Sequence, residues 1–328
     1  LDAIIDAKLR HVLATADGWV HGDAHLLSEG GTQIVQALTQ WSEDRGAADR
    51  KAVAAVVLTH LLAVAADISA QTVVSWAATR WASVNTLFDY ALDRLLPEHG
   101  DDPAVVPLGR NKTAAALLDA AHRMGRVGFD YAAYYGGTPN PRSANKSLPN
   151  GSVAVWNVYD HGVNNAEGAL RWPAELYRLN GSLHDGRAAM RLVTDGLDRW
   201  HAQAQGTMCA DEVFCGRDPE RGVETCTVVE MLASLEQSFA TLGDAALMDR
   251  VERIGFNALP AALTADMWTH AYVHQANSVY AGVTHPKSTR GREHTHAHAA
   301  AGHAARTCPR GACSGEPPQV EASHALPP

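Results

Sequence analysis

The chain has 328 residues, five cysteines and a formal net charge of −9 at pH 7. This charge, without any lysine- or arginine-rich run, argues against nucleic-acid binding, which requires a basic surface to displace counterions. No window approaches the roughly 18 apolar residues needed to cross a bilayer, so we expect no membrane span. The cysteines are too few and too irregularly placed for a disulfide framework, so they imply no particular redox compartment.

Helical periodicity dominates the chain from its first residues. Apolar side chains from Leu1 to Leu13 follow helical spacing, and Gly18 and Gly22 interrupt it. Further helices are predicted at about 48–66, 72–96, 111–126, 161–179, 184–202, 225–241 and 244–265. Long alternating patterns of the kind that predict strands are nearly absent, so the expected fold class is mainly α.

Two joints between predicted helices resemble each other. In each, a glycine suited to the left-handed position after a helix precedes a capping residue: Gly181 before Ser182, and Gly243 before Asp244. The interval between them suits two helical hairpins, or one hairpin enlarged by a functional loop, which would be 203–223. We therefore expect an (α/α)6 toroid of stacked helical hairpins.

Two stretches depart from the helical pattern. Residues 127–157 are rich in Gly, Pro, Asn and Tyr and predict an ordered loop with a short extended segment at 152–156. After about Ser288 the composition loses its aromatic residues and apolar periodicity, as is typical of a disordered tail. The expected organisation is one helical domain at 1–287 and a tail at 288–328.

The segment 211–226 concentrates chemically active side chains around a loop rich in Gly and charged residues. Two thiols, Cys215 and Cys226, lie near Glu212 and Glu224 in the sequence. A carboxylate and a thiolate two residues apart can share a zinc ion, although a closed site needs about four ligands. The predicted helix start at Thr225 should lower the pKa of the neighbouring thiol. Alternatively, Cys226 is a small buried residue and Glu224 a helix N-terminal charge.

Two other groups of residues suit a sugar ligand. His161 and Asn164 lie at a predicted helix start, and Trp76, Arg80 and Trp81 lie on another helix. Imidazole and amide groups can bind sugar hydroxyls, while indole rings pack against sugar C–H faces. The alternative is that these residues cap helices or pack in the core.

Glycoside hydrolysis usually requires a carboxylic acid beside the scissile bond. Glu212 is the best candidate, because a carboxyl group on a loop within an apolar cavity can have a raised pKa. A serine-hydrolase elbow, a P-loop and an HExxH motif are all absent from the sequence, which excludes those reaction classes.

Several sequence blocks resemble the β-L-arabinofuranosidase family, glycoside hydrolase family 127. The blocks are DGWVHGD, SWAATRW, HGVNNAEGALRWPAELYRLNG, DE followed by GVETC, and LGDAALMDRVERIGFNALPAAL, in that order over roughly residues 1–287. The resemblance implies a six-hairpin α/α barrel, a carbohydrate substrate, and a retaining mechanism in which a zinc-bound cysteine thiolate attacks the anomeric carbon. It places the acid/base on Glu212, zinc ligands on Glu224 and Cys226, and a sugar contact on His161; Asn164 and Trp81 are further sugar-contact candidates.

The sequence departs from this family in one respect. The family has an adjacent Cys-Cys pair that supplies the nucleophile and further zinc ligands, whereas Cys308 and Cys313 are not adjacent and lie in a dissimilar tail. We therefore expect a domain truncated at both ends, with low activity or none. A noncatalytic carbohydrate-binding remnant is the alternative. A third possibility, a helical interaction scaffold, expects Glu212 and Glu224 on separate faces.

Overall fold

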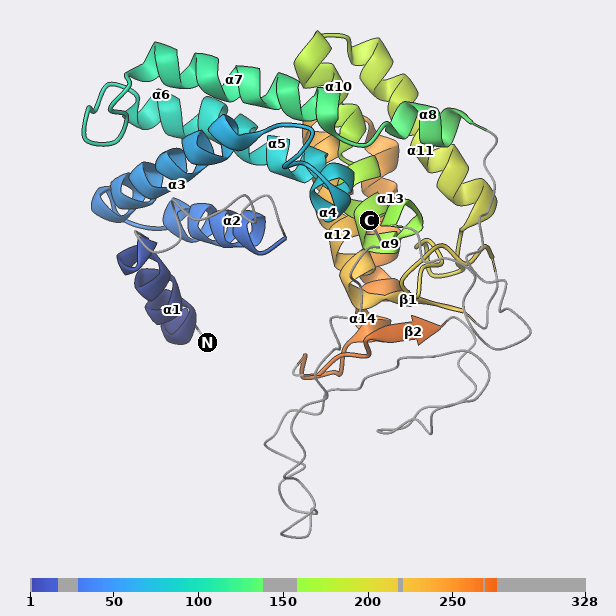
Figure 1. The fold of residues 1–328 in the computed structure, drawn as a ribbon. Coiled ribbons are helices and arrows are strands. Elements are labelled where there is room, and N and C mark those ends of the chain that lie inside the picture. The colour runs from blue at the N-terminus through green and yellow to red at the C-terminus, as the bar shows by residue number, and fades with distance from the viewer. Residues whose placement is uncertain (1, 17–28, 138–157, 218–220, 268, 276–328) are drawn as a thin grey trace.

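The computed structural model describes residues 2–16, 29–137, 158–217, 221–267 and 269–275, and these residues are mostly helical (Figure 1). The first half contains α1 (Asp2–Ala14), α2 (Glu29–Glu43), α3 (Ala47–Asp67), α4 (Ser75–Thr79), α5 (Trp81–Tyr90), the π-helix η3 (Ala91–Leu95), α6 (Leu96–His99), α7 (Arg110–Val127) and α8 (Tyr131–Gly136). The second half contains η4 (Val158–Asp160), α9 (Gly162–Asn164), the π-helix η5 (Asn165–Ala169), α10 (Trp172–Asn180), α11 (Leu183–Trp200), β1 (Gly222–Glu224), α12 (Thr225–Leu242), α13 (Ala245–Phe256), α14 (Ala258–Ala262) and β2 (Val273–Gln275).

Neighbouring helices form hairpins. Helices α2 and α3, α10 and α11, and α12 and α13 pack against each other in pairs, and Figure 1 shows the pairs following an arc from α1 to α13. The mainly α, helical-hairpin prediction is thereby confirmed. Strands β1 and β2 pair antiparallel and contact α12 and α14, so the small sheet lies at one end of the last hairpin (Figure 1).

Both predicted joints have the expected geometry. Gly181 has φ 73° and Gly243 has φ 63°, and both are left-handed. The Ser182 hydroxyl accepts a hydrogen bond from the Asp185 N–H at 3.2 Å, and the Asp244 carboxylate accepts one from the Ala246 N–H at 3.1 Å. Each cap satisfies one of the free N–H groups at a helix start, which fixes where the second helix of each hairpin begins.

Some local predictions were wrong or lie outside the described residues. Helix α2 was not predicted, and α8 lies in the first part of the stretch expected to be a loop, where Asp130 caps it through the Ala133 N–H. The Gly18–Gly22 interruption, the extended segment 152–156 and the tail 288–328 fall outside the described part of the chain.

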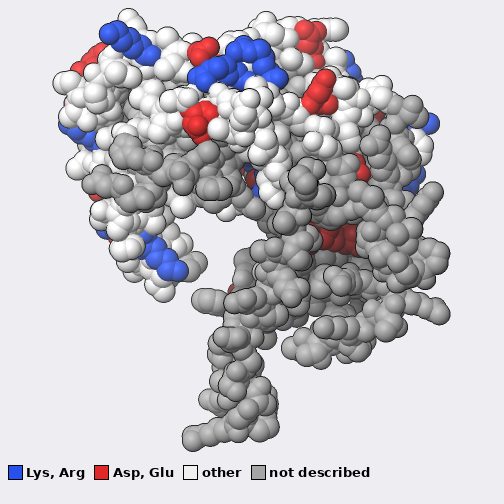
Figure 2. Space-filling model, viewed as in Figure 1, with Lys and Arg blue, Asp and Glu red and all other residues white. Residues whose placement is uncertain are grey.

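A continuous apolar core joins the hairpins. Val53, Val57 and Leu61 of α3 are almost completely buried, as is Met124 of α7. Helix α3 therefore contributes to the core along much of its length. Among the described helices, none combines the length and apolar character required to cross a bilayer. Figure 2 shows basic and acidic side chains interspersed over the arc on the face in view.

Gly168 of η5 gives a test of this packing. A Cβ at this position would lie 2.0 Å from the Thr79 carbonyl oxygen and 2.1 Å from the Tyr131 hydroxyl, so the backbone would have to move. We expect Gly168→Ala to lower the free energy of unfolding by about 2–3 kcal/mol, measured by urea denaturation. Gly255→Ala in α13 is the matched control: it has open space, and alanine should raise stability by about 0.5–1 kcal/mol. Equal effects of both changes would contradict this account.

Candidate active site

A disulfide-closed loop carries Glu212. Cys209 and Cys215 form a disulfide, with their Cα atoms 5.3 Å apart, so the expectation that Cys215 is a free thiol was wrong. Glu212 lies midway between the two cysteines and has φ 132°, a conformation that residues with a side chain rarely adopt. Such strained residues are frequent at functional sites, where surrounding contacts hold them in place.

The loop lies between the start of α9 and the small sheet. Val213 forms an antiparallel bridge with His161, and Gly162 donates its N–H to the Glu212 carbonyl at 2.8 Å. On its other side, Glu224 donates its N–H to the Ala210 carbonyl at 3.0 Å. These contacts bring together segments that are about 50 and about 12 residues from Glu212 in the sequence.

Three side chains converge at this point. The ligand atoms of His161, Glu212 and Glu224 all lie within 4.8 Å of one another. His161 Nε2 is 3.3 Å from Glu212 Oε2, and the Tyr272 hydroxyl donates a hydrogen bond to Glu212 Oε1 at 3.3 Å. Glu224 is 1 % exposed, whereas the Glu212 side chain is 43 % exposed. The cluster therefore has one buried carboxylate and one that solvent or substrate can reach.

The two carboxylates have opposite pKa shifts. Burial and the neighbouring Glu212 charge raise the pKa of Glu224 to about 7. Burial also acts to raise the pKa of Glu212, but the hydrogen bond and charge of His161 outweigh it, so this pKa lies below its usual value. The raised pKa expected for Glu212 from its sequence context was therefore wrong for the metal-free protein. The two neighbouring carboxyl groups therefore differ in their affinity for a proton, as is common in sites that carry out acid/base chemistry.

Cys226 extends the cluster toward α12. Its Sγ lies 3.1 Å from Glu224 Oε2, and it is the free cysteine of the described residues. Although Cys226 as a residue is exposed, the protein atoms packed around its thiol and the adjacent Glu224 charge raise the pKa of the thiol, and backbone N–H groups at the helix start offset this only in part. The lowered pKa expected from the helix N-terminus was wrong without a bound cation, because a nearby anion disfavours a second one.

The cluster of His161, Glu212 and Glu224 is a group that could hold a metal ion. Glu224 Oε1 is buried and accepts no hydrogen bond within the described part of the chain, which is costly unless a cation or proton occupies the position. Zinc prefers imidazole nitrogen, carboxylate oxygen and thiolate sulfur as donors. His161, Glu212 and Glu224 supply the first two types within 4.8 Å of one another, and the Cys226 thiol lies beside Glu224 without being part of that group. The predicted zinc ligands Glu224 and Cys226 are thus adjacent, whereas the group whose ligand atoms all lie within 4.8 Å of one another combines Glu224 with His161 and Glu212.

The sugar-contact candidates separate into two groups. The Trp76 ring meets the His161 ring edge-on with centroids 4.8 Å apart, and Trp76 is half-buried. Trp81 instead lies in the core: its indole N–H donates to the Phe129 carbonyl at 3.1 Å, and its ring fills the space beside Gly128. The described contacts therefore tie Trp76, and not Trp81, to the cluster, and the sugar contact of Trp81 stays a prediction.

Asn164 has a supporting position. Its side-chain oxygen accepts a hydrogen bond from Arg80 Nε at 2.7 Å, and its amide donates to the Val158 carbonyl at 2.7 Å. Arg80 also pairs with Glu167 at 2.8 Å and lies over the Trp76 ring at 5.0 Å. Asn164 therefore fixes the arginine that supports Trp76, and its direct contact with a sugar stays a prediction.

Tyr272 is the site residue that sequence reasoning missed. It lies 60 residues from Glu212, directly before β2, and reaches the carboxylate because β2 pairs with β1. Burial, together with the Glu224 and Glu212 charges, raises the pKa of Tyr272, so the hydroxyl keeps its proton and donates it in a hydrogen bond. A single tyrosine after an irregular segment carries no motif that identifies this role.

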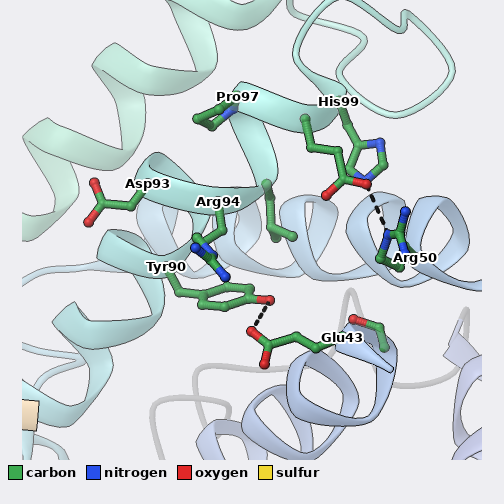
Figure 3. A pocket seen from close by; sticks show the side chains of 10 residues that line it. Glu43, Arg50, Tyr90, Asp93, Arg94, Pro97 and His99 are labelled. Carbon is green, nitrogen blue, oxygen red and sulfur yellow. Dashed lines mark hydrogen bonds and ion pairs between the residues drawn. The ribbon is translucent and has the colours of Figure 1, made fainter. Parts of the chain in front are cut away.

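A pocket lies away from the cluster. It has a volume of about 560 Å³ and is lined by residues of α2, α3, α5, η3 and α6 (Figure 3). Several of its charged side chains already interact with one another: Tyr90 donates to Glu43 at 3.2 Å, and Arg50 pairs with Glu98 at 3.0 Å. The predicted site residues are not among those that line it, so the candidate active site remains the cluster around Glu212.

Comparison with known families supports this choice. Residues 153–303 match the model of the β-L-arabinofuranosidase, GH127 catalytic domain, a span that contains His161, Glu212, Glu224 and Cys226. The resemblance to glycoside hydrolase family 127 is confirmed over this span. No curated protein matches the chain. The span that is similar to this glycoside hydrolase domain therefore contains the whole cluster.

His201 gives a pH-dependent test of the loop that carries Glu212. It stacks on Phe214 with centroids 4.0 Å apart, its Nδ1 accepts the Gly216 N–H at 3.3 Å, and burial lowers its pKa to about 4. As the pH is lowered from 6.5 to 4, His201 takes up a proton in the unfolded chain but not in the folded protein. The free energy of unfolding should therefore decrease by up to about 3 kcal/mol over this range.

His201→Asn keeps an acceptor near the Nδ1 position but does not titrate. Urea denaturation of both proteins at pH 7 and pH 4.5 should show a smaller loss of stability in the variant. An unchanged pH dependence would assign the loss of stability to other groups.

Proposed function

We propose that this protein is a retaining glycoside hydrolase that acts on L-arabinofuranoside-type bonds, with Glu212 as the acid/base. The observation that supports this most directly is the convergence of Glu212 with His161 and Glu224 inside the span that matches family 127. We also propose residues 1–287 as the catalytic domain and 288–328 as a separate tail; the family match extends to residue 303 and so includes the first part of that tail. The joint location of Glu212 and Glu224 argues against the interaction scaffold, which requires them on separate faces.

Glu212 has the exposure that this role requires, and its lowered pKa keeps it a carboxylate, so it must take up a proton before it acts as the general acid. As general acid, its carboxyl group gives a proton to the leaving-group oxygen while the glycosidic bond breaks; as general base, it then takes a proton from the attacking water. His161 and Tyr272 each contact one of its oxygens, so they orient the carboxylate. The half-buried Trp76 ring beside His161 offers an apolar surface for the C–H face of a sugar.

Glu224 and Cys226 are the residues proposed to hold zinc. When bound, zinc keeps a coordinated thiol deprotonated at neutral pH. Cys226 is the free thiol of the described residues, and the family's Cys-Cys pair has no counterpart in the sequence. We therefore expect slow turnover or none from this 328-residue chain by itself.

The assay that tests this function uses two substrates. An aryl and an alkyl β-L-arabinofuranoside are incubated with the full chain, and NMR identifies the anomer released first. Hydrolysis with retention supports the proposal, and hydrolysis with inversion contradicts it. Binding of arabinose-containing oligosaccharides without hydrolysis, in protein that also lacks zinc, would favour the noncatalytic carbohydrate-binding alternative.

A further inference from the structure

The Cys209–Cys215 disulfide closes a loop of seven residues with Glu212 at its centre. Both cysteines are buried, so the bond lies beneath the loop and not on the surface. Val213 and Phe214 are buried beside it, whereas the Glu212 side chain emerges toward the cluster. The disulfide therefore joins the two ends of the segment that presents the proposed acid/base.

The same loop is bonded to both neighbouring parts of the site. Toward α9, the Glu212 carbonyl accepts the Gly162 N–H at 2.8 Å, one residue after His161. Toward the sheet, Ala210 donates its N–H to the Gly222 carbonyl at 3.0 Å, and the Ala210 carbonyl accepts the Glu224 N–H at 3.0 Å. The loop thus sets the position of Glu212 relative to both His161 and Glu224.

The conformation of Glu212 needs this restraint. Its φ of 132° is unfavourable for a residue with a Cβ, so a loop free to relax would leave this conformation. A short covalent closure removes most of the alternative loop conformations. The hydrogen bonds at Ala210 and Glu212 then hold the conformation that remains.

We propose that Cys209 and Cys215 are positioning residues, whose disulfide holds Glu212 in its position relative to His161 and Glu224. The role of this position in catalysis rests on the proposed function, but the effect of the disulfide on the loop can be measured without any substrate. Neither cysteine touches a reacting group, so their effect is exerted through the backbone of the loop.

Amide hydrogen exchange of the Cys209→Ala/Cys215→Ala variant tests the proposal. The informative protons are the Gly162 and Glu224 amides, which bond to loop carbonyls. The reference is the Phe129 amide, which bonds to the Ala78 carbonyl at 2.8 Å in another part of the fold. We expect the two loop-bound amides to exchange at least about 10-fold faster than in the native protein, with the Phe129 amide much less affected.

Leu58→Ala in α3 is the matched control, because it removes buried apolar contacts far from the loop along the chain. It should accelerate exchange of all three amides together, in proportion to the lost global stability. Native protection of Gly162 and Glu224 in the double alanine variant would overturn the proposal. So would equal acceleration at Phe129, because the disulfide would then act only on global stability.

Reduction of the native protein gives a second measurement if the double variant does not fold. A water-soluble phosphine converts the disulfide to two thiols: the phosphine takes up the oxygen atom of one water molecule, and the sulfurs take up its two protons. Mass spectrometry confirms reduction, and the same three amides are compared. Loss of all three together would overturn the proposal, as would finding Cys209 and Cys215 as free thiols in protein purified under oxidising conditions.

Kinetics separate this inference from the proposed function. In an active enzyme, opening the disulfide should lower kcat at least about 10-fold and change KM less than about threefold, because substrate contacts outside the loop remain. Selective loss of amide protection in a chain that hydrolyses no glycoside would retain the positioning role and remove the proposed function. If activity is lost in Glu212→Gln but is unaltered when the disulfide is opened, the proposed function is retained and the positioning role is removed.

Discussion

Glu212→Gln is expected to lower kcat for an alkyl L-arabinofuranoside by roughly 10²- to 10⁴-fold, the usual contribution of a general acid/base. Glutamine has nearly the same shape and can still contact His161 and Tyr272, but it cannot transfer the proton. KM should change little, because the loss occurs in the transition state. Steady-state kinetics with the purified full chain measure both quantities.

The leaving group shows whether Glu212 acts as the acid. An aryl leaving group with a low pKa departs without protonation, so the first step of Glu212→Gln should be much less impaired with an aryl than with an alkyl substrate. Asp211→Asn is the matched control, since it neutralises the adjacent carboxylate, which pairs with Arg221. It should retain activity within about threefold. Equal losses with both substrates, or full activity of Glu212→Gln, would remove Glu212 from this role.

The helices were predictable where the spacing of apolar residues along the sequence matches the face that the helix buries in the fold. The predicted spans 48–66 and 111–126 match α3 and α7 within one residue at either end, because apolar spacing marks the buried face of each helix. The hairpin joints were predictable because Gly181 and Gly243 adopt the backbone conformation that favours glycine. Helix α2 was missed, since its polar and glycine-containing start hides a buried face that includes Val35 and Leu38.

The site was predictable only in part, for a different reason. Glu224 and Cys226 are two residues apart, so sequence spacing alone brings them together at the start of α12. The Tyr272 contact and the Cys209–Cys215 bond depend on how distant or bent segments meet in space, which spacing does not specify. The pKa shifts depend on burial and on the neighbouring charges, so residue type alone could not give their direction.

Cys226→Ser is expected to weaken zinc binding at least about 100-fold, because a serine hydroxyl does not replace a thiolate as a ligand. The native chain, purified and dialysed against zinc-free buffer, should retain close to one zinc per molecule, and the variant should retain none. Metal analysis by inductively coupled plasma mass spectrometry measures the ratio. Glu230→Gln, also in α12 but paired with Arg171, is the matched control and should keep its zinc.

The pH dependence of zinc affinity gives the sharper result. Metal ligands bind in their deprotonated forms, and in the metal-free protein the Glu224 pKa is about 7 while the Cys226 pKa is raised by burial and by Glu224. Zinc must therefore displace about one proton from Cys226 and a fraction of one from Glu224, so affinity should rise about tenfold or more from pH 6 to pH 7. In Cys226→Ser this rise should be smaller, because the thiol proton is no longer displaced. A native affinity that does not change with pH would mean that neither residue is a ligand, and that any bound zinc lies elsewhere in the chain.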